Sequence, residues 1–235
     1  IFMGYSDTTV NHFMMNKAGL VSLYGPSIMA EFGEYVKMFD YTKEAVKNIL
    51  FSKCNNYEIK SSEVWSGDYL DWDEKNINIA KKLIKELHGY EILQGSGVIT
   101  GKLLGGCIDV FPMIVGTEIW PTKEEWKDKI LLIETSEDRP NPIYITYYLR
   151  NLGALGIFDE IKGIIVGKPQ AEQYYEEYKE VYKKVLKEFN KETLPVLYNV
   201  NIGHSEPIGI LPLGTEIEVD FDKKKIYLKE SPTIN

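Results

Sequence analysis

The start of the chain places a serine just after a short apolar stretch and a glycine. Residues 1–9 read IFMGYSDTT, so Ser6 follows Gly4 by two positions and precedes a helix-like stretch. This pattern is typical of a nucleophile elbow, a tight strand-to-helix turn that exposes a hydroxyl to a base and a substrate. The backbone N–H of Asp7 would then point, with the helix N-terminus, at an oxyanion formed by attack. Thr8 replaces the usual second glycine, and a serine in this context is also an ordinary helix N-cap, so both interpretations stay open.

A histidine near the other end of the chain is the best candidate for a general base. The chain has three histidines, and this side chain is the ordinary proton acceptor near neutral pH. We expect His12 to face the core from the helix after Ser6, and His88 to stand at a helix end, where a cation suits the helix dipole. His204 lies in a loop between two apolar stretches, in NVNIGHSEP (residues 199–207). By elimination His204 is the predicted base, although a histidine in a loop is more often a surface residue.

A carboxylate that could orient this histidine ends a predicted buried strand. Residues 129–138 read KILLIETSED, and the four apolar residues predict a strand with Glu134 at its C-terminal end. Sites of open α/β sheets gather at the carboxyl ends of strands. A carboxylate there could accept the Nδ1–H of His204 and stabilise the imidazolium. The alternative is a strand-end acid in water, which fits Glu137 and Asp138 of the following polar loop better.

Six short motifs follow one another between residue 1 and about residue 220. They are GYSDTT (4–9), YGP (24–26), GKLLGG (101–106), IE (133–134), the pair GIIVG and PVLY (163–167 and 195–198), and GH followed by a proline (203–207). In this order they resemble the elbow, turn, Gly-Gly motif, core strands and histidine loop of the LD-carboxypeptidase family of serine peptidases. Within that family the resemblance is to the microcin C immunity carboxypeptidase branch. No single motif is specific, and their order carries the resemblance.

The resemblance implies a role for each candidate residue. Ser6 would be the nucleophile, His204 the general base and acid, and Glu134 the carboxylate that orients the histidine. The backbone N–H of Asp7 would give half of the oxyanion hole. The implied reaction is hydrolysis of an amide through an acyl-enzyme, with no metal and no organic cofactor. The implied fold is α/β, with a nucleophile-elbow α/β domain followed by a C-terminal α/β domain of the swivelling type.

Family members carry a segment before the elbow, including a Gly-rich loop that supplies the other oxyanion donor. This chain starts at Ile1, within the elbow strand, so we expect it to hold only a remnant of the nucleophile domain. Losing one oxyanion donor typically costs about 10²–10³ in rate, so the family activity is expected of the whole protein and less of this chain alone. Missing strands would also expose sheet edges, which leaves a homodimer open.

Composition and charge are those of a globular protein without a surface for polyanions. The 235 residues are 44% hydrophobic and 26% charged, with a net charge of −8. This charge argues against nucleic acid and anionic membranes as partners. Cys54 and Cys107 lack metal-type spacing, so we expect free thiols in a reducing, cytoplasmic compartment. No apolar stretch approaches a transmembrane length.

The chain is expected to divide in three. Residues 1–50 would form the partial nucleophile domain, 51–95 a connecting or lid segment, and 96–235 a C-terminal α/β domain that carries the glutamate and the histidine. Apolar spacing predicts strands at 20–23, 130–133, 163–166 and 217–219, helices at 8–18, 29–32, 42–50, 75–87, 143–152 and 171–189, and a terminal hairpin at 220–228. Thr42 is the expected N-cap of its helix. Strands that alternate with helices indicate an α/β fold.

The middle segment holds aromatic residues that could contact a ligand. Residues 63–72 read EVWSGDYLDW, which puts Trp65 and Trp72 in a polar stretch. Exposed rings of this kind either anchor a lid or stack on a ligand ring. The immunity branch uses a tryptophan in about this region to stack on a nucleobase. Trp72 lies nearer the right place than Trp65, although the spacing does not decide between them.

Three functions stay open on the sequence. One is hydrolysis of an aminoacyl nucleotide joined by an amide or acyl-sulfamate bond, which the tryptophans favour. The second is removal of a terminal D-Ala from a murein tetrapeptide. The third is a catalytically inactive ligand-binding module in which Ser6 is only a helix cap. In each case the partner is a small molecule or a short peptide.

Overall fold

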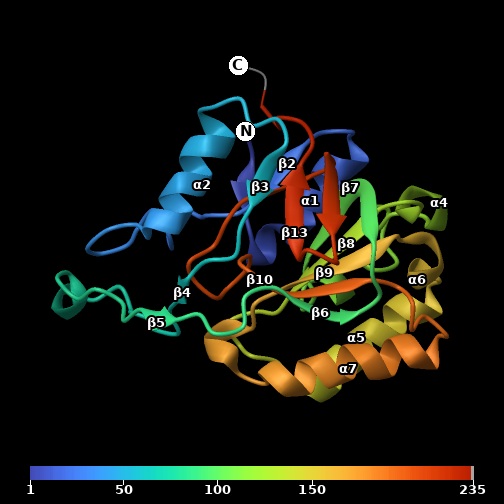
Figure 1. Ribbon diagram of the computed structural model, residues 1–235. Helices are drawn as coiled ribbons and strands as arrows, with labels where there is room; N and C mark the ends of the chain where they lie inside the picture. The colour runs from blue at the N-terminus through green and yellow to red at the C-terminus, as the bar shows by residue number, and fades with distance from the viewer. Residues whose placement is uncertain (234–235) are drawn as a thin grey trace.

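A computed structural model of the protein describes residues 1–233 and centres on an eight-stranded mixed sheet (Figure 1). The strand order is β3-β13-β12-β7-β8-β9-β10-β6. The strands are β3 (Tyr57–Ile59), β6 (Glu91–Gln94), β7 (Val98–Cys107), β8 (Ile130–Glu134), β9 (Gly163–Gly167), β10 (Val196–Val200), β12 (Glu216–Asp220) and β13 (Lys225–Leu228). The middle four, β7 to β10, run parallel, and the outer strands pair antiparallel to them or to each other. The expected α/β class is confirmed.

The parallel strands are buried on both faces, which explains their continuous apolar sequences. Strand residues alternate between faces. In β8, Leu131 and Ile133 join a core with the helices α5 (Pro142–Ala154) and α7 (Tyr175–Glu188), which lie side by side below the sheet in Figure 1. Ile130 and Leu132 join a second core with α2 (Asp40–Leu50). The same alternation puts Glu134 on the face of this second core. The short helices are α3 (Phe111–Ile114), α4 (Lys123–Trp126), α6 (Ile157–Glu160), η1 (Ser6–Thr8), η2 (Glu74–Asn76) and η3 (Gln170–Glu172).

A separate three-stranded sheet carries the N-terminal segment. Its order is β1-β2-β11, with β1 (Met3–Gly4) parallel to β2 (Ser22–Tyr24) and β11 (Leu211–Leu213) antiparallel to β2. Helix α1 (Thr9–Lys17) connects β1 to β2 and packs on β7, where the Thr9 hydroxyl accepts the N–H of Cys107 at 3.0 Å. A side chain at Gly106 would collide with Thr9 and crowd the ring of Tyr24. The Gly-Gly motif therefore lets the N-terminal unit pack closely against the large sheet.

The segment between β3 and β6 differs most from the sequence expectation. The predicted helix over 75–87 is wrong, because this stretch holds only η2 and the strand β5 (Ile84–Lys85), which pairs with β4 (Val64–Trp65). Figure 1 shows it running out from the body. Side chains outside this stretch hold its backbone in a non-helical path: Asp68 accepts the N–H of Lys82 at 2.6 Å, and Lys81 pairs with carboxylates of Glu34 and Glu206. Local helix propensity yields to such tertiary contacts.

Three smaller differences from the sequence predictions concern one short helix and the starts of two longer ones. Residues 29–32 form turns instead of a helix, because the Glu31 carboxylate accepts the N–H of Ser27 and closes a short loop. Thr42 is not an N-cap; it lies inside α2, and its hydroxyl donates to the carbonyl of Ile208 at 2.8 Å. The long amphipathic helix starts at Tyr175 and not at 171, since Ala171, Glu172 and Tyr174 have positive φ.

The other expected elements are present within about two residues of their predicted bounds, including the terminal hairpin of β12 and β13. The division of the chain in three stays a prediction; the middle segment contributes β3 and β6 to the edges of the large sheet. In the described part of the chain, no helix has the length and apolar character needed to cross a membrane.

Candidate functional site

Ser6 occupies a sharp turn directly after β1. Its φ of 60° is in the left-handed region, which costs an L-residue about 1–2 kcal/mol and is a mark of functional turns. Gly4 makes the turn feasible, because a Cβ there would lie 2.9 Å from the Thr8 hydroxyl. That hydroxyl donates instead to the carbonyl of Tyr5 at 2.8 Å and closes the turn. The geometry is that of an elbow, with Ser6 at its tip and η1 and α1 following.

His12 holds this turn from inside the core, as expected from its place on the helix. Its Nε2 lies 2.9 Å from the carbonyl of Gly4 and its Nδ1 lies 2.8 Å from the Ser22 hydroxyl. Burial lowers its pKa from 6.5 to about 4, so the ring is neutral at pH 7. A carbonyl only accepts, so Nε2–H donates to Gly4, and Nδ1 accepts from Ser22. His12 therefore pins β1 to β2 and has no free nitrogen for chemistry.

His88 is also committed elsewhere. The sequence predicted His88 at a helix end, and this is wrong, because the predicted helix before it is absent. Its ring stacks on Tyr175 with centroids 4.7 Å apart, and its Nδ1 lies 3.7 Å from a carboxylate oxygen of Glu91. Of the three histidines, only His204 lines a cavity together with Ser6.

His204 is bonded to Glu134 at the carboxyl end of β8. The distance from His204 Nδ1 to Glu134 Oε2 is 2.7 Å, and the glutamate is completely buried. The loop that carries the histidine approaches Glu134 closely at Gly203, which has a φ of 91° and no room for a side chain against that carboxylate. Asn201 anchors the same loop, because its Oδ1 accepts the N–H of Ser62 at 2.8 Å. Sequence positions 70 residues apart thus meet as a histidine–carboxylate pair.

The other nitrogen of His204 has a partner that the sequence did not indicate. Glu137 Oε2 lies 2.9 Å from His204 Nε2, although the Glu137 side chain is 55% exposed. Burial alone would lower the pKa of His204, but Glu134 and Glu137 outweigh it and raise the pKa from 6.5 to about 10. The hydrogen bond with His204 in turn lowers the pKa of Glu137 from 4.5 to about 2. In this arrangement the ring is an imidazolium at pH 7, and it must lose a proton before it can act as a base.

Replacing Glu137 by glutamine is therefore expected to speed up, at neutral pH, any reaction in which His204 serves as the base. Removing one negative charge beside the imidazolium lowers the pKa of His204, by about one unit for a partner that is half exposed to water. The acid limb of kcat/KM, which reports this pKa in the free enzyme, should move to lower pH by the same amount. At pH 7, kcat/KM should rise about tenfold. Asp138→Asn, at the exposed neighbouring acid, should leave the limb in place; an unmoved limb in Glu137→Gln would contradict the expectation.

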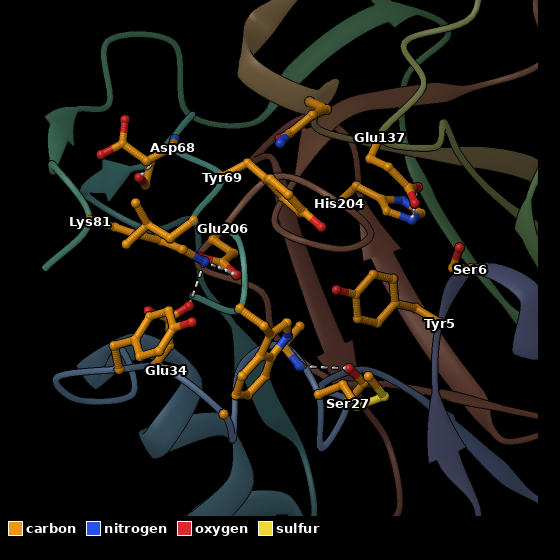
Figure 2. A pocket seen from close by; sticks show the side chains of 18 of the residues that line it. Tyr5, Ser6, Ser27, Glu34, Asp68, Tyr69, Lys81, Glu137, His204 and Glu206 are labelled. Carbon is orange, nitrogen blue, oxygen red and sulfur yellow. Dashed lines mark hydrogen bonds and ion pairs between the residues drawn. The ribbon is translucent and has the colours of Figure 1, made fainter. Parts of the chain in front are cut away.

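The cavity in front of Ser6 and His204 has a volume of about 620 Å³. Figure 2 shows Ser6, His204, Glu137 and Tyr5 at one end and Lys81 with Glu34 and Glu206 at the other. The ring of Tyr5 meets that of His204 edge-on, with centroids 5.0 Å apart, and its hydroxyl donates to Glu31 at 3.1 Å. Tyr5 thereby forms a wall that supports the histidine.

The far end of the cavity is an ion cluster that sequence patterns gave no reason to expect. Lys81 Nζ lies 2.7 Å from Glu206 Oε2 and also pairs with Glu34, and all three side chains are nearly buried. Burial raises the pKa of Glu206 from 4.5 to about 7, against the effect of Lys81. The cluster joins the extended middle segment, the turn before α2 and the histidine loop, three parts of the chain that border the cavity.

The two tryptophans have different surroundings. Trp72 lines the cavity, is 65% exposed, and lies against Tyr35 with ring centroids 5.6 Å apart. Trp65 is buried, with Lys168 Nζ 4.7 Å from its ring centroid, and is not among the residues that line the cavity. Asp7 also lines the cavity beside Ser6. Of the two tryptophans predicted to contact a ligand, Trp72 lines the cavity and Trp65 does not.

Comparison with known proteins identifies the family. The model of the LD-carboxypeptidase C-terminal domain matches residues 100–219. The chain belongs to the LD-carboxypeptidase family. It is 32% identical to the microcin C7 self-immunity protein MccF of Escherichia coli over 98% of this chain and 65% of that protein. A putative carboxypeptidase of Vibrio cholerae is 27% identical over 98% of this chain and 66% of that protein. The chain thus spans about two thirds of the length of these LD-carboxypeptidase relatives.

Solved structures of the family have the same fold. The MccF-like protein of Streptococcus pneumoniae in complex with AMP gives a TM-score of 0.86 at 32% identity, over 96% of this chain and 68% of that one. MccF in complex with aspartyl sulfamoyl adenosine gives 0.85 at 32% identity, over 100% of this chain and 68% of that one. Both place this LD-carboxypeptidase family member close to the MccF branch.

Proposed function

We propose that the protein is a serine carboxypeptidase or amidase that hydrolyses an amide bond through an acyl-enzyme. The observation that carries the proposal is the bond between His204 Nδ1 and Glu134, at a cavity that Ser6 lines from a left-handed turn. Such a constellation is defined by geometry and roles and not by sequence position. Membership of the LD-carboxypeptidase family supports a hydrolase of this type.

In the proposed reaction, Ser6 Oγ attacks the carbonyl carbon while His204 Nε2 takes the hydroxyl proton. Glu134 holds the ring in the tautomer with the proton on Nδ1 and stabilises the imidazolium. The N–H of Asp7 donates to the oxyanion of the tetrahedral intermediate. His204 then protonates the leaving nitrogen, and a water deprotonated by the same ring hydrolyses the acyl-enzyme. Glu137 must move away from His204 Nε2 before the first step, since its carboxylate and the Ser6 hydroxyl would contact the same nitrogen.

The proposed substrate is an aminoacyl nucleotide with an amide or acyl-sulfamate bond. Two observations support it: relatives bind AMP and aspartyl sulfamoyl adenosine, and Trp72 presents a largely exposed ring at the cavity. The second candidate substrate is a murein tetrapeptide with a terminal D-Ala, because the chain belongs to the LD-carboxypeptidase family. A ligand-binding protein without catalysis is the third, in which Ser6 serves only as a turn residue.

A hydrolysis assay read by mass spectrometry separates these candidates. The two substrates are aspartyl sulfamoyl adenosine and a murein tetrapeptide, and the control is Ser6→Ala. Cleavage of the first that depends on Ser6 supports the aminoacyl-nucleotide proposal, and cleavage of the second supports the murein alternative. Binding of adenosine monophosphate with no cleavage of either would contradict the catalytic proposal.

Replacing Trp72 by alanine is expected to weaken nucleotide binding. Stacking of a base on an aromatic side chain contributes about 1–3 kcal/mol, so Kd for adenosine monophosphate should rise about 5- to 150-fold. Calorimetric titration would measure it. Tyr144→Ala removes a ring of similar exposure on α5, outside the cavity lining, and should leave Kd unchanged. Equal affinities of Trp72→Ala and the wild type would refute the stacking role.

A further inference from the structure

A buried tyrosine connects the nucleophile turn to the histidine–carboxylate pair. Tyr24 ends β2 and is completely buried. Its hydroxyl lies 2.6 Å from Glu134 Oε1 and 3.2 Å from the backbone nitrogen of Ser6. These two groups come from opposite parts of the site, one from the elbow and one from the end of β8, and Tyr24 touches both with a single oxygen.

The direction of these hydrogen bonds follows from the chemistry of the groups. An ionised carboxylate only accepts, so the O–H of Tyr24 donates to Glu134, and the N–H of Ser6 donates to the tyrosine oxygen. Glu134 Oε2 is engaged by His204 Nδ1 at 2.7 Å, which leaves Oε1 for the tyrosine. The two oxygens therefore have donors from two different segments, and these fix the rotation of the carboxylate.

Tyr24 keeps its proton at neutral pH and well into the alkaline range. Burial, followed by the charge of Glu134, raises its pKa well above the ordinary value of 10. The hydroxyl is thus a permanent donor and takes no part in proton transfer. It is not among the residues that line the cavity, so it does not touch a substrate there.

We propose that Tyr24 is a positioning residue: its hydroxyl fixes Glu134 in the orientation that meets His204 and fixes the backbone of Ser6 in the left-handed turn. This inference rests on the proposed function, since it assigns how the same three residues are held together. It also gives the Gly-Gly motif a role, because a side chain at Gly106 would come within 3.0 Å of the Tyr24 ring.

The test is Tyr24→Phe, which keeps the ring and removes the hydroxyl. The loss of a hydrogen bond to a charged group is expected to lower kcat about 10- to 100-fold, with KM nearly unchanged. Without this donor, Glu134 presents more negative charge to the imidazolium, so the acid limb of kcat/KM should move to higher pH by about half a unit to one unit. A purely structural role would reduce the folded fraction and leave the limb in place.

Two further variants complete the test: a matched control, and a change at Tyr24 that should shift the acid limb of kcat/KM in the opposite direction. Tyr198→Phe removes an equally buried hydroxyl, which donates to the carbonyl of Tyr175 at 3.0 Å, and should move neither kcat nor the limb. Site-specific Tyr24→3-fluorotyrosine makes the hydroxyl a stronger donor, so the limb should move to lower pH even if Tyr24→Phe folds poorly. If the wild type is active and the acid limb of kcat/KM lies at the same pH in both Tyr24 variants as in the wild type, the inference is overturned. The proposed function would still stand. A wild type that cleaves no substrate would overturn both.

Discussion

Replacing Ser6 by alanine is expected to lower kcat by about 10⁴-fold or more while the protein stays folded. The change removes the hydroxyl that is proposed to form the acyl-enzyme, and the remaining rate would come from substrate binding and the oxyanion donor. Alanine meets the same backbone strain as serine at a φ of 60°, so stability should change little. Single-turnover hydrolysis followed by mass spectrometry gives the rate, and circular dichroism checks the fold.

Ser27→Ala is the matched control for this change. Ser27 also lines the cavity, and its hydroxyl accepts only the N–H of Ala30 at 3.2 Å. We expect it to retain most of the wild-type kcat. If Ser6→Ala kept the rate of Ser27→Ala, hydrolysis would proceed without this nucleophile, and the acyl-enzyme route would be wrong.

Replacing Glu134 by glutamine is expected to lower kcat about 10⁴-fold, the loss seen when the acid of a triad becomes an amide. The amide can donate to His204 Nδ1 and so favour the tautomer with its proton on Nε2, which cannot accept a proton from Ser6. Loss of the negative charge also lowers the pKa of His204, so the acid limb of kcat/KM should move to lower pH. The variant should thus combine a lower kcat with an acid limb of kcat/KM at lower pH. Neither unfolding nor simple loss of substrate binding produces this combination.

The contrast with Glu137 sharpens this prediction. Both carboxylates raise the pKa of His204, yet Glu134→Gln should lower the rate at pH 7 and Glu137→Gln should raise it. The difference arises because one partner sits on Nδ1, behind the ring, and the other on Nε2, the nitrogen that must face the nucleophile. Parallel losses of rate in the two variants would mean that Glu137 contacts the substrate, contrary to this account.

Local sequence patterns predicted the fold class and several residues of the candidate site. Strand β8 follows from four apolar residues in a row, and the position of Glu134 follows from the end of that run. The elbow at Ser6 follows from a glycine two residues before a serine at the end of an apolar stretch, and His204 follows by elimination among three histidines. These signals are local, or arise from the rarity of one residue type, and so they survive without knowledge of the packing.

The residues that sequence reasoning missed depend on contacts between distant segments. Glu137 reads as a solvated loop acid, and only the turn of the loop after β8 brings it to His204 Nε2. Tyr24 reads as part of a turn after a short strand. Its role appears only when its hydroxyl meets Glu134 at the end of β8, 110 residues away in the sequence. The failed helix over 75–87 has the same origin, since ion pairs of Lys81 with Glu34 and Glu206 set that backbone.

The most direct measurement is covalent labelling with a fluorophosphonate, followed by intact mass and peptide mapping. We expect one adduct, on Ser6. It should form faster as pH rises and His204 loses its proton, and far more slowly in His204→Ala. The adduct mimics the tetrahedral intermediate, so it reports the nucleophile whatever the natural substrate is. Hydrolysis of substrate by a protein that forms no adduct on Ser6 would contradict the claim that this serine is the nucleophile.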